Sequence, residues 1–314
     1  MNYREIIAVN QSLLKKIAKG PYYYDGESNA DHFVLGTLTE AMYNKDAYNY
    51  IVMDFPSKTT NLGKLLNAVW DMTKFQGSWT TVEQRQSIYN SLNIKSPKFE
   101  TIDLDVIEFF NPFINIDISN TIVVSADIMS KAVNMVEKLQ NDRFVNQLFS
   151  VDGEVVNSFV IEWNHQEPCI YNDSVIKMKA EIDKLIIDYT HKTIQVVDLK
   201  TMGDLNYNFS SSFWKYRYDV QAAFYKYGVD CIINNQFPGF TQLNPIFIAV
   251  DPYSPHPLIY QTSNDTLKVG EHGKTTPYGE YMPGWRHLLD LYRFYEVHGY
   301  EYPKEVQING VLPI

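Results

Sequence analysis

Two strand-like segments joined by a short turn limit the folds open to this chain more than any other stretch of its sequence. Residues 174–188 and 193–199 are rich in isoleucine, valine and leucine, and residues 190–192 between them are typical of a turn. The second segment carries the apolar run 194–197, which is typical of a strand buried inside a sheet. The sequence therefore predicts a hairpin that includes a central strand, and the rest of the fold must pack around that sheet.

Charged side chains interrupt this apolar hairpin. Asp183 lies on the first strand, and Asp198 and Lys200 lie at the end of the second. Alternate side chains of a strand share a face, so Asp198 and Lys200 are expected to point the same way and Leu199 into the core. Charges at the end of a central strand are costly without a purpose. If Asp183 lies beside Asp198, two carboxylates and one ammonium converge; otherwise the three are solvated charges, a pattern that often arises by chance.

Two carboxylates and an ammonium are the groups that metal-assisted phosphodiester hydrolysis requires. Carboxylate oxygens hold hard cations such as Mg²⁺. The metal polarises the phosphoryl group and lowers the pKa of a bound water. A neighbouring lysine orients that water or stabilises the developing charge. The three residues together therefore favour a phosphodiesterase.

Apolar spacing indicates a helical region before Gly153 and a mixed region after it. Before it we expect a loop at 21–30, an irregular stretch at 97–120, and helices over residues 1–20, 31–44, 60–95 and 125–149. After it we expect strands over 155–163 and 245–250, and helices over 213–234 and 283–298. The predicted fold class is α/β, with a mixed central sheet flanked by helices and a helical N-terminal region.

Composition excludes several classes of protein. The net charge is −10, from 27 Lys and Arg against 37 Asp and Glu, which argues against generic affinity for nucleic acid but leaves a local basic groove open. Two cysteines cannot build a disulfide framework, a four-cysteine zinc site or an iron–sulfur cluster. No apolar run approaches the roughly 18–20 residues that cross a bilayer, and the start has no signal-peptide order. We expect a cytoplasmic protein.

The hairpin resembles the core of the PD-(D/E)XK nuclease superfamily, in which an aspartate on one strand precedes an acidic-x-lysine motif on the next. It is most similar to the exonuclease VIII-like branch, related to RecB-type nuclease domains. Where that branch has Arg-x-Asp-Lys and Asp-Leu-Lys-Thr, this chain has Glu181-Ile-Asp183-Lys184 and Asp198-Leu199-Lys200-Thr201. The branch's Gln-x-x-x-Tyr on the following helix is matched by Gln221 and Tyr225, one turn apart on one helix face.

One element departs from the pattern of the branch. Its N-terminal helix has Gly-Thr-x-x-His, and the histidine helps to hold metal; here Gly36-Thr37-Leu38-Thr39 is followed by Glu40. A carboxylate ligates Mg²⁺ at least as well as imidazole, so the chemistry is retained while the metal preference stays open. The resemblance covers about residues 31–50 and 125–303. It implies one nuclease domain over residues 1–314, with a PD-(D/E)XK restriction-endonuclease-like core at 31–50 and 150–314 and a mainly helical insertion at 55–148.

The resemblance implies a Mg²⁺-dependent DNA exonuclease that processes duplex ends for recombination in bacteria or phage-infected cells, with Mn²⁺ as an alternative ion. Glu40, Asp183, Asp198 and the Leu199 carbonyl would bind the metal, and Lys200 would position the attacking water. Gln221 and Tyr225 would brace the site or contact DNA. The expected partners are duplex ends, a single-strand annealing protein and further copies of the chain in a ring, with no membrane partner.

Aromatic and basic residues are interleaved just before Gln221. Lys215 and Arg217, with Trp214 and Tyr216 beside them, suit contact with a DNA backbone, although a helix that packs its aromatic residues inward explains the pattern equally well.

The sequence also leaves functions other than an exonuclease open. A structure-specific or single-strand nuclease with the same core, and a non-catalytic DNA-binding protein of this fold, both stay open. Gly273-Lys274-Thr275 lacks the first glycine and the strand-to-helix context of a P-loop. The histidines form no metal-spaced pair, so zinc is not expected.

Overall fold

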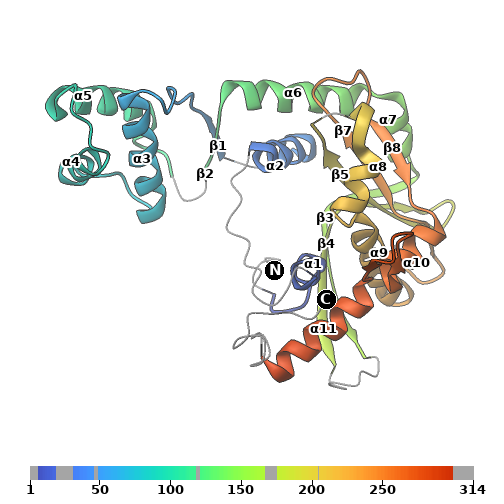
Figure 1. Cartoon of the computed structure of the whole chain (residues 1–314). Helices are drawn as coiled ribbons and strands as arrows, with labels where there is room; N and C mark the ends of the chain where they lie inside the picture. Colours follow the sequence, from blue (N-terminus) through green and yellow to red (C-terminus); the bar gives the residue numbers. More distant parts are fainter. Residues whose placement is uncertain are drawn as a thin grey trace. The chain divides into compact units, whose positions relative to one another are not determined.

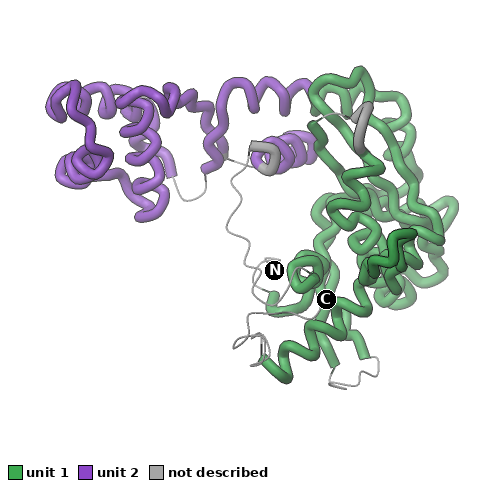
Figure 2. The backbone as a smooth tube through the Cα atoms, viewed as in Figure 1, with its two compact units in different colours: residues 1–32, 135–314 green, residues 33–134 purple. Residues whose placement is uncertain are grey.

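The computed structural model describes residues 6–18, 31–45, 49–117, 121–166, 175–203 and 205–299 (Figure 1). The chain divides into two compact units, unit 1 with residues 1–32 and 135–314 and unit 2 with residues 33–134 (Figure 2). Residues 33–50, expected in the nuclease core, therefore group with most of the expected insertion. The loop expected at 21–30 lies outside the described residues, as do parts of the helix expected at 1–20.

A mixed sheet forms the centre of unit 1, which confirms the predicted α/β class. Its strand order is β3-β4-β5-β7-β8, and β6 (Thr241–Gln242) pairs with β5. The bounds of the five strands are Gly153–His165, Ile176–Asp188, Thr193–Thr201, Ile246–Val250 and Leu258–Gln261. β3, β4 and β5 are antiparallel neighbours, β5 and β7 are parallel, and β8 is antiparallel to β7.

The central strand β5 changes partners along its length. It pairs with β4 from Thr193 to Val197, where the last pair is Val197 with Lys184. From Val197 to Thr201 it pairs with β7 on its other side. Asp183 directly precedes Lys184, and Asp198 directly follows Val197, so both aspartates lie where β4 and β5 separate.

Helix α9 (Tyr218–Gln236) packs across β3 and β4 and carries much of the core. Its Phe224 ring lies 5.1 Å from the ring of Trp163 on β3. Gly228 permits this close approach, because a Cβ there would lie 2.8 Å from the Trp163 ring. The other helices of unit 1 are α1 (Gln11–Ile17), α7 (Arg143–Phe149), α8 (Leu205–Lys215), α10 (Asn264–His272) and α11 (Trp285–His298).

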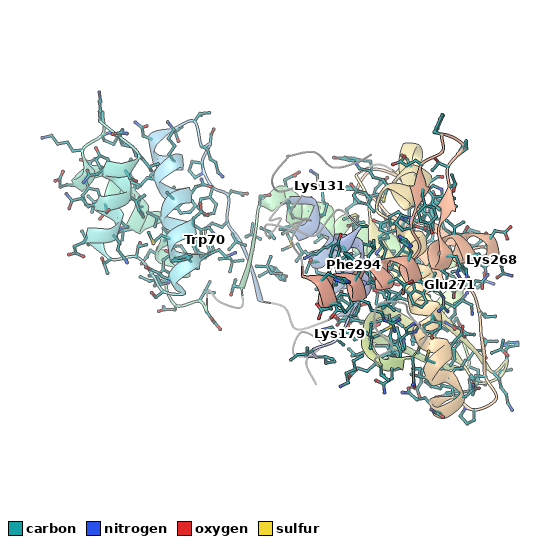
Figure 3. The ribbon with its side chains drawn as sticks, turned by 60° about the horizontal axis from the view of Figure 1, so that its bottom comes forward. Trp70, Lys131, Lys179, Lys268, Glu271 and Phe294 are labelled. Carbon is teal, nitrogen blue, oxygen red and sulfur yellow. The ribbon has the colours of Figure 1, made fainter. Side chains whose placement is uncertain are left out.

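Unit 2 has a separate aromatic core. Trp70 of α3 stacks on Phe110 of α5, with ring centroids 6.2 Å apart, and Trp79 lies 5.3 Å from Phe110 (Figure 3 labels Trp70). Its elements are α2 (Asp31–Asn44), α3 (Asn61–Gln76), α4 (Val82–Ser91), α5 (Phe99–Phe110), η2 (Asn111–Phe113) and the parallel pair β1 (Asn49–Val52) and β2 (Thr121–Val124). Helix α6 (Ala126–Asn141) begins in unit 2 and ends in unit 1.

The structure corrects the prediction that residues 97–120 are irregular, because α5 occupies 99–110. Its acidic residues obscured a helical stripe of Ile102, Val106 and Phe110, all buried.

Three predicted helices are each divided. The helix predicted over 60–95 is two, because α3 ends at Gly77 in the left-handed conformation and Thr81 caps the start of α4. The helices predicted over 125–149 and 213–234 are divided as well. Asp142 follows α6 and begins α7 by accepting hydrogen bonds from the N–H groups of Phe144 and Val145. Arg217, with φ of 54°, separates α8 from α9. No helix among those described is both long and apolar enough to cross a lipid bilayer.

Candidate active site

Asp183 links the two strands at the point where their ladder ends. Its Oδ2 accepts a hydrogen bond of 2.9 Å from the N–H of Leu199. A strand amide at this position would otherwise face the gap between β4 and β5, and buried amides are rarely left without an acceptor. The Asp183 carboxylate is therefore held beside the backbone of the Asp198-Leu199-Lys200 motif.

Asp198 is 2% exposed and is held on both of its oxygens. Oδ1 accepts a 2.6 Å hydrogen bond from Nε2 of Gln221, and Oδ2 contacts the ammonium of Lys200. Gln221 Nε2 also lies 3.2 Å from the hydroxyl of Tyr225. Gln221 and Tyr225 are both buried, which favours bracing of Asp198 over contact with DNA.

The charge of Lys200 is set by competing effects. Burial alone would lower the pKa of its ammonium, but the carboxylates of Asp198 and Asp183 outweigh burial and raise that pKa above its ordinary value. The ammonium also lies 4.8 Å from the centre of the Tyr218 ring, a cation–π distance. Burial raises the pKa of the Tyr218 phenol. At neutral pH the site therefore holds a protonated lysine against a protonated tyrosine.

The two predicted DNA-contact residues, Lys215 and Arg217, have different surroundings at the junction between α8 and α9. Arg217 donates from Nε and Nη2 to the carboxylate of Asp219, both at 3.0 Å, and Nη2 also donates to the Pro283 carbonyl at 2.7 Å. Asp219 is fully buried, so this pair holds the start of α9 in place. Lys215 is exposed, and its ammonium lies 5.3 Å from the Tyr216 ring. A DNA-contact role stays a prediction for both.

Lys15 also lies beside the junction of α8 and α9, although nothing in the local sequence around Lys15 predicted this position. It lies on α1, and its Nζ donates a 3.1 Å hydrogen bond to the Tyr216 carbonyl. It also lies 5.7 Å from the centre of the Tyr218 ring that Lys200 approaches. Burial lowers the pKa of Lys15 to about 7; Lys200 lowers it further, while Asp198 and Asp219 oppose the effect. Lys15 therefore lies in the electrostatic field of the predicted site.

The donor set suits a hard divalent cation. Asp198 Oδ2 is buried with no hydrogen-bond donor in good geometry, and the Lys200 ammonium is its ion-pair neighbour. Within the described residues no three His, Cys, Asp or Glu side chains gather around one point. Within unit 1, Asp183 and Asp198 would therefore rely on the Leu199 carbonyl, water and substrate for further ligands, which is the coordination that Mg²⁺ favours.

Glu40 lies in unit 2, whereas Asp183, Asp198 and Lys200 lie in unit 1. It occupies the middle of α2 and is half-buried. Its part in the metal site stays a prediction.

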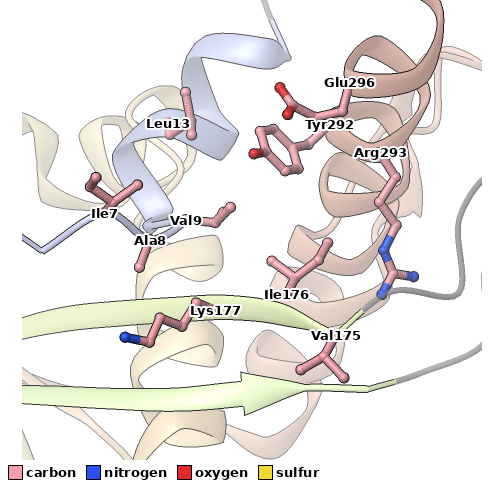
Figure 4. Close-up of a pocket in the computed structure, with 10 residues that line it drawn as sticks. All are labelled: Ile7, Ala8, Val9, Leu13, Val175, Ile176, Lys177, Tyr292, Arg293 and Glu296. Atoms are coloured by element: carbon pink, nitrogen blue, oxygen red, sulfur yellow. The ribbon is translucent and has the colours of Figure 1, made fainter.

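A separate cleft of about 390 Å³ lies between the N-terminal segment, the start of β4 and α11 (Figure 4). Its walls include Val9, Leu13, Lys177, Tyr292 and Glu296. None of the carboxylate, lysine, glutamine or tyrosine groups of the candidate site lines it.

The comparisons with known proteins agree with this geometry. Residues 72–271, more than half of the chain, match the model of a family described as a PDDEXK-like domain of unknown function (DUF3799). The chain belongs to this family. The PDDEXK-like match includes Asp183, Asp198, Lys200, Gln221 and Tyr225, and confirms the predicted PD-(D/E)XK superfamily. Glu40 and Lys15 lie outside the matched residues.

The remaining comparisons add little to the PDDEXK-like assignment. No curated protein matches the chain. Among solved structures, one titled "Crystal structure of SSO0001" matches with 11% sequence identity, over 76% of this chain and 80% of that one. Its TM-score is 0.28, so it supports no argument about this chain.

Proposed function

We propose that this protein is a Mg²⁺-dependent deoxyribonuclease that hydrolyses phosphodiester bonds from the ends of duplex DNA. One observation supports this most strongly: Asp183 and Asp198 lie where β4 and β5 separate, and the Lys200 ammonium contacts Asp198. A protein that only bound DNA would gain nothing from a partly buried lysine directed at a carboxylate. Membership of a PDDEXK-like family supports a nuclease-type fold.

Asp183 and Asp198 would hold the metal through carboxylate oxygens, with the Leu199 carbonyl and Glu40 as further ligands. When bound, the ion supplies Lewis-acid polarisation of the phosphoryl group and a lowered pKa for nearby water. Mn²⁺ has the same preference for oxygen ligands and would substitute.

The remaining side chains orient these groups. Lys200 is protonated at Nζ and donates hydrogen bonds to the attacking water or to a phosphate oxygen, which stabilises charge as it develops. Gln221 fixes Oδ1 of Asp198 and so leaves Oδ2 directed at Lys200. Tyr225 fixes Gln221 in turn. The three residues form a buried chain that keeps the carboxylate in one rotamer.

Action on DNA ends and assembly into a ring rest on the resemblance to the exonuclease VIII-like branch. A net charge of −10 is compatible with a ring, because a basic channel and an acidic exterior can coexist. In that setting a role in recombination and a single-strand annealing protein as partner belong to the same proposal.

Cleavage of three matched substrates tests the proposal. End-labelled linear duplex, end-labelled single strand and covalently closed circular duplex are incubated with wild type and with Asp198→Asn, with and without Mg²⁺. We expect degradation of the linear duplex alone, only with Mg²⁺, and none by the variant.

Each other outcome has a distinct meaning. Cutting of the circle would replace the exonuclease with an endonuclease, and preference for the single strand would support a single-strand nuclease. Binding of duplex without cleavage by the wild type would leave a non-catalytic DNA-binding protein.

A further inference from the structure

Helix α1 is tied to the strand that carries Asp183. The N–H of Val9 donates to the Lys177 carbonyl, and the N–H of Lys179 donates to the Val9 carbonyl, both at 2.9 Å. The buried ammonium of Lys179 donates to the Ile6 carbonyl at 2.7 Å. Leu14 of α1 belongs to the core of unit 1. These contacts give Lys15 a defined position relative to β4.

The Tyr218 ring joins Lys15 to the candidate active site. Lys15 Nζ lies 5.7 Å and Lys200 Nζ 4.8 Å from the centre of that one ring. Two ammonium groups gathered at one ring repel each other, and the repulsion is stronger than in water because the site is partly buried.

Two other cations act electrostatically on Lys15, and both have carboxylate partners. Lys200 contacts Asp198, and Arg217 pairs with Asp219. In the described part of the chain, Lys15 contacts the Tyr216 carbonyl and the Tyr218 ring, and neither carries a negative charge. A neutral donor would serve the carbonyl as well, without the cost of burying a charge.

We propose that Lys15 binds a phosphate of the nucleic-acid strand, next to the phosphate that is cleaved at the site of Asp183, Asp198 and Lys200. The proposal rests on the proposed function, since it names a substrate contact of the same site. An ammonium has three donors, so Lys15 keeps its bond to the Tyr216 carbonyl and directs the others at phosphate oxygens. The contact recognises the charge of the phosphate and is therefore independent of the base sequence.

Lys15 has an alternative role, in which its ammonium only caps the last carbonyls of α8. Cations are favourable at helix C-termini, and Tyr216 directly follows α8. Such a cap would influence folding but would not change how DNA binding depends on salt. The two roles therefore differ in a measurable quantity.

Three substitutions separate charge from packing and from hydrogen bonding. Lys15→Met retains the length of the side chain, Lys15→Gln retains a donor for the Tyr216 carbonyl, and Lys15→Arg retains the charge. Lys268→Met is a matched control, because Lys268 is exposed on α10 (Figure 3). The thermal midpoint of each variant checks that it is folded, and Lys15→Gln decides the question if Lys15→Met does not fold.

Single-turnover cleavage of a labelled duplex in Mg²⁺ is measured against enzyme concentration, from about 50 to 200 mM KCl. We expect Lys15→Met and Lys15→Gln to need about ten- to a hundredfold more enzyme for half-maximal rate, the effect of losing a charged hydrogen bond. The slope of log affinity against log salt should become shallower by about 0.9, the contribution of one phosphate contact. Lys15→Arg and Lys268→Met should behave like the wild type.

Weaker binding with an unchanged salt slope would assign Lys15 to α8 alone and overturn the proposal, as would wild-type behaviour of both neutral variants. If the wild type cuts nothing, the proposed nuclease function fails by itself. The same salt series is then read by fluorescence anisotropy on the intact duplex, and it supports or overturns the phosphate contact independently of cleavage.

Discussion

Replacing Lys15 by methionine should change how the stability of unit 1 depends on pH. Burial, assisted by Lys200, lowers the pKa of Lys15 in the folded protein from 10.5 to about 7. Below about pH 7 the lysine is charged in the folded and unfolded states, so the full cost of burying that charge is present. Above pH 7 the folded protein loses the proton while the unfolded chain keeps it until about pH 10.5, so stability rises with pH.

The magnitude follows from the size of the shift. One pKa unit corresponds to about 1.36 kcal/mol. Between about pH 6 and pH 9 the folded state releases most of one proton that the unfolded state retains, which amounts to about 2–3 kcal/mol. Wild type should gain this stability relative to Lys15→Met, because the variant has no such group.

Urea denaturation in EDTA measures the free energy of unfolding of both proteins at each pH. Hydrogen exchange in peptides from β4 follows the unfolding of unit 1 separately from unit 2. Most other titrations cancel in the difference between the two proteins. If the difference in free energy of unfolding between wild type and Lys15→Met stays constant within about 0.5 kcal/mol from about pH 6 to about pH 9, burial of the charged Lys15 does not destabilise the fold and the reasoning is refuted.

Substitutions at three further residues test other parts of the site. Gln221→Leu removes the donor to Oδ1 of buried Asp198, so it should destabilise the metal-free protein by about 1.5–3 kcal/mol in urea denaturation; a loss below about 0.5 kcal/mol would mean that Gln221 does not brace the carboxylate. Glu40→Gln should weaken Mg²⁺ binding in calorimetry and Glu40→His should shift preference toward Mn²⁺, whereas unchanged affinity in both would remove Glu40 from the site. Arg217→Met leaves the fully buried Asp219 without its partner and should cost about 3–5 kcal/mol in thermal unfolding, and a cost near zero would show that the pair is not structural.

The hairpin and its charged residues were predictable because their signals are local. An apolar run with a charged end indicates a central strand, and Asp198 and Lys200 share a face through the two-residue period of a strand. The helix over 99–110 was missed because its apolar stripe is mixed with acidic residues. At the break between α8 and α9, Arg217 also contacts distant Pro283, and no local pattern indicates such a contact.

Contacts between distant parts of the chain could not be predicted from one sequence. Lys15 reaches the site because Val9 bridges to β4, and that bridge joins residues far apart in the chain. The exact point where β4 and β5 separate likewise depends on pairing between strands, since the last pair of that ladder is Lys184 with Val197. Both features decide the electrostatics of the site, so the charge of Lys15 and the setting of Lys200 required the structure.

Calorimetric titration of Mg²⁺ tests the central claim most directly, because it measures the metal site without assuming a substrate. Wild type, Asp183→Asn, Asp198→Asn and Lys200→Met are compared in the same buffer, each checked for folding by its thermal midpoint. We predict that wild type and Lys200→Met bind Mg²⁺, since an ammonium is not a metal ligand, and that both asparagine variants lose binding because a carboxylate oxygen is removed. Undiminished Mg²⁺ binding by a folded Asp198→Asn protein would contradict the assignment of this site.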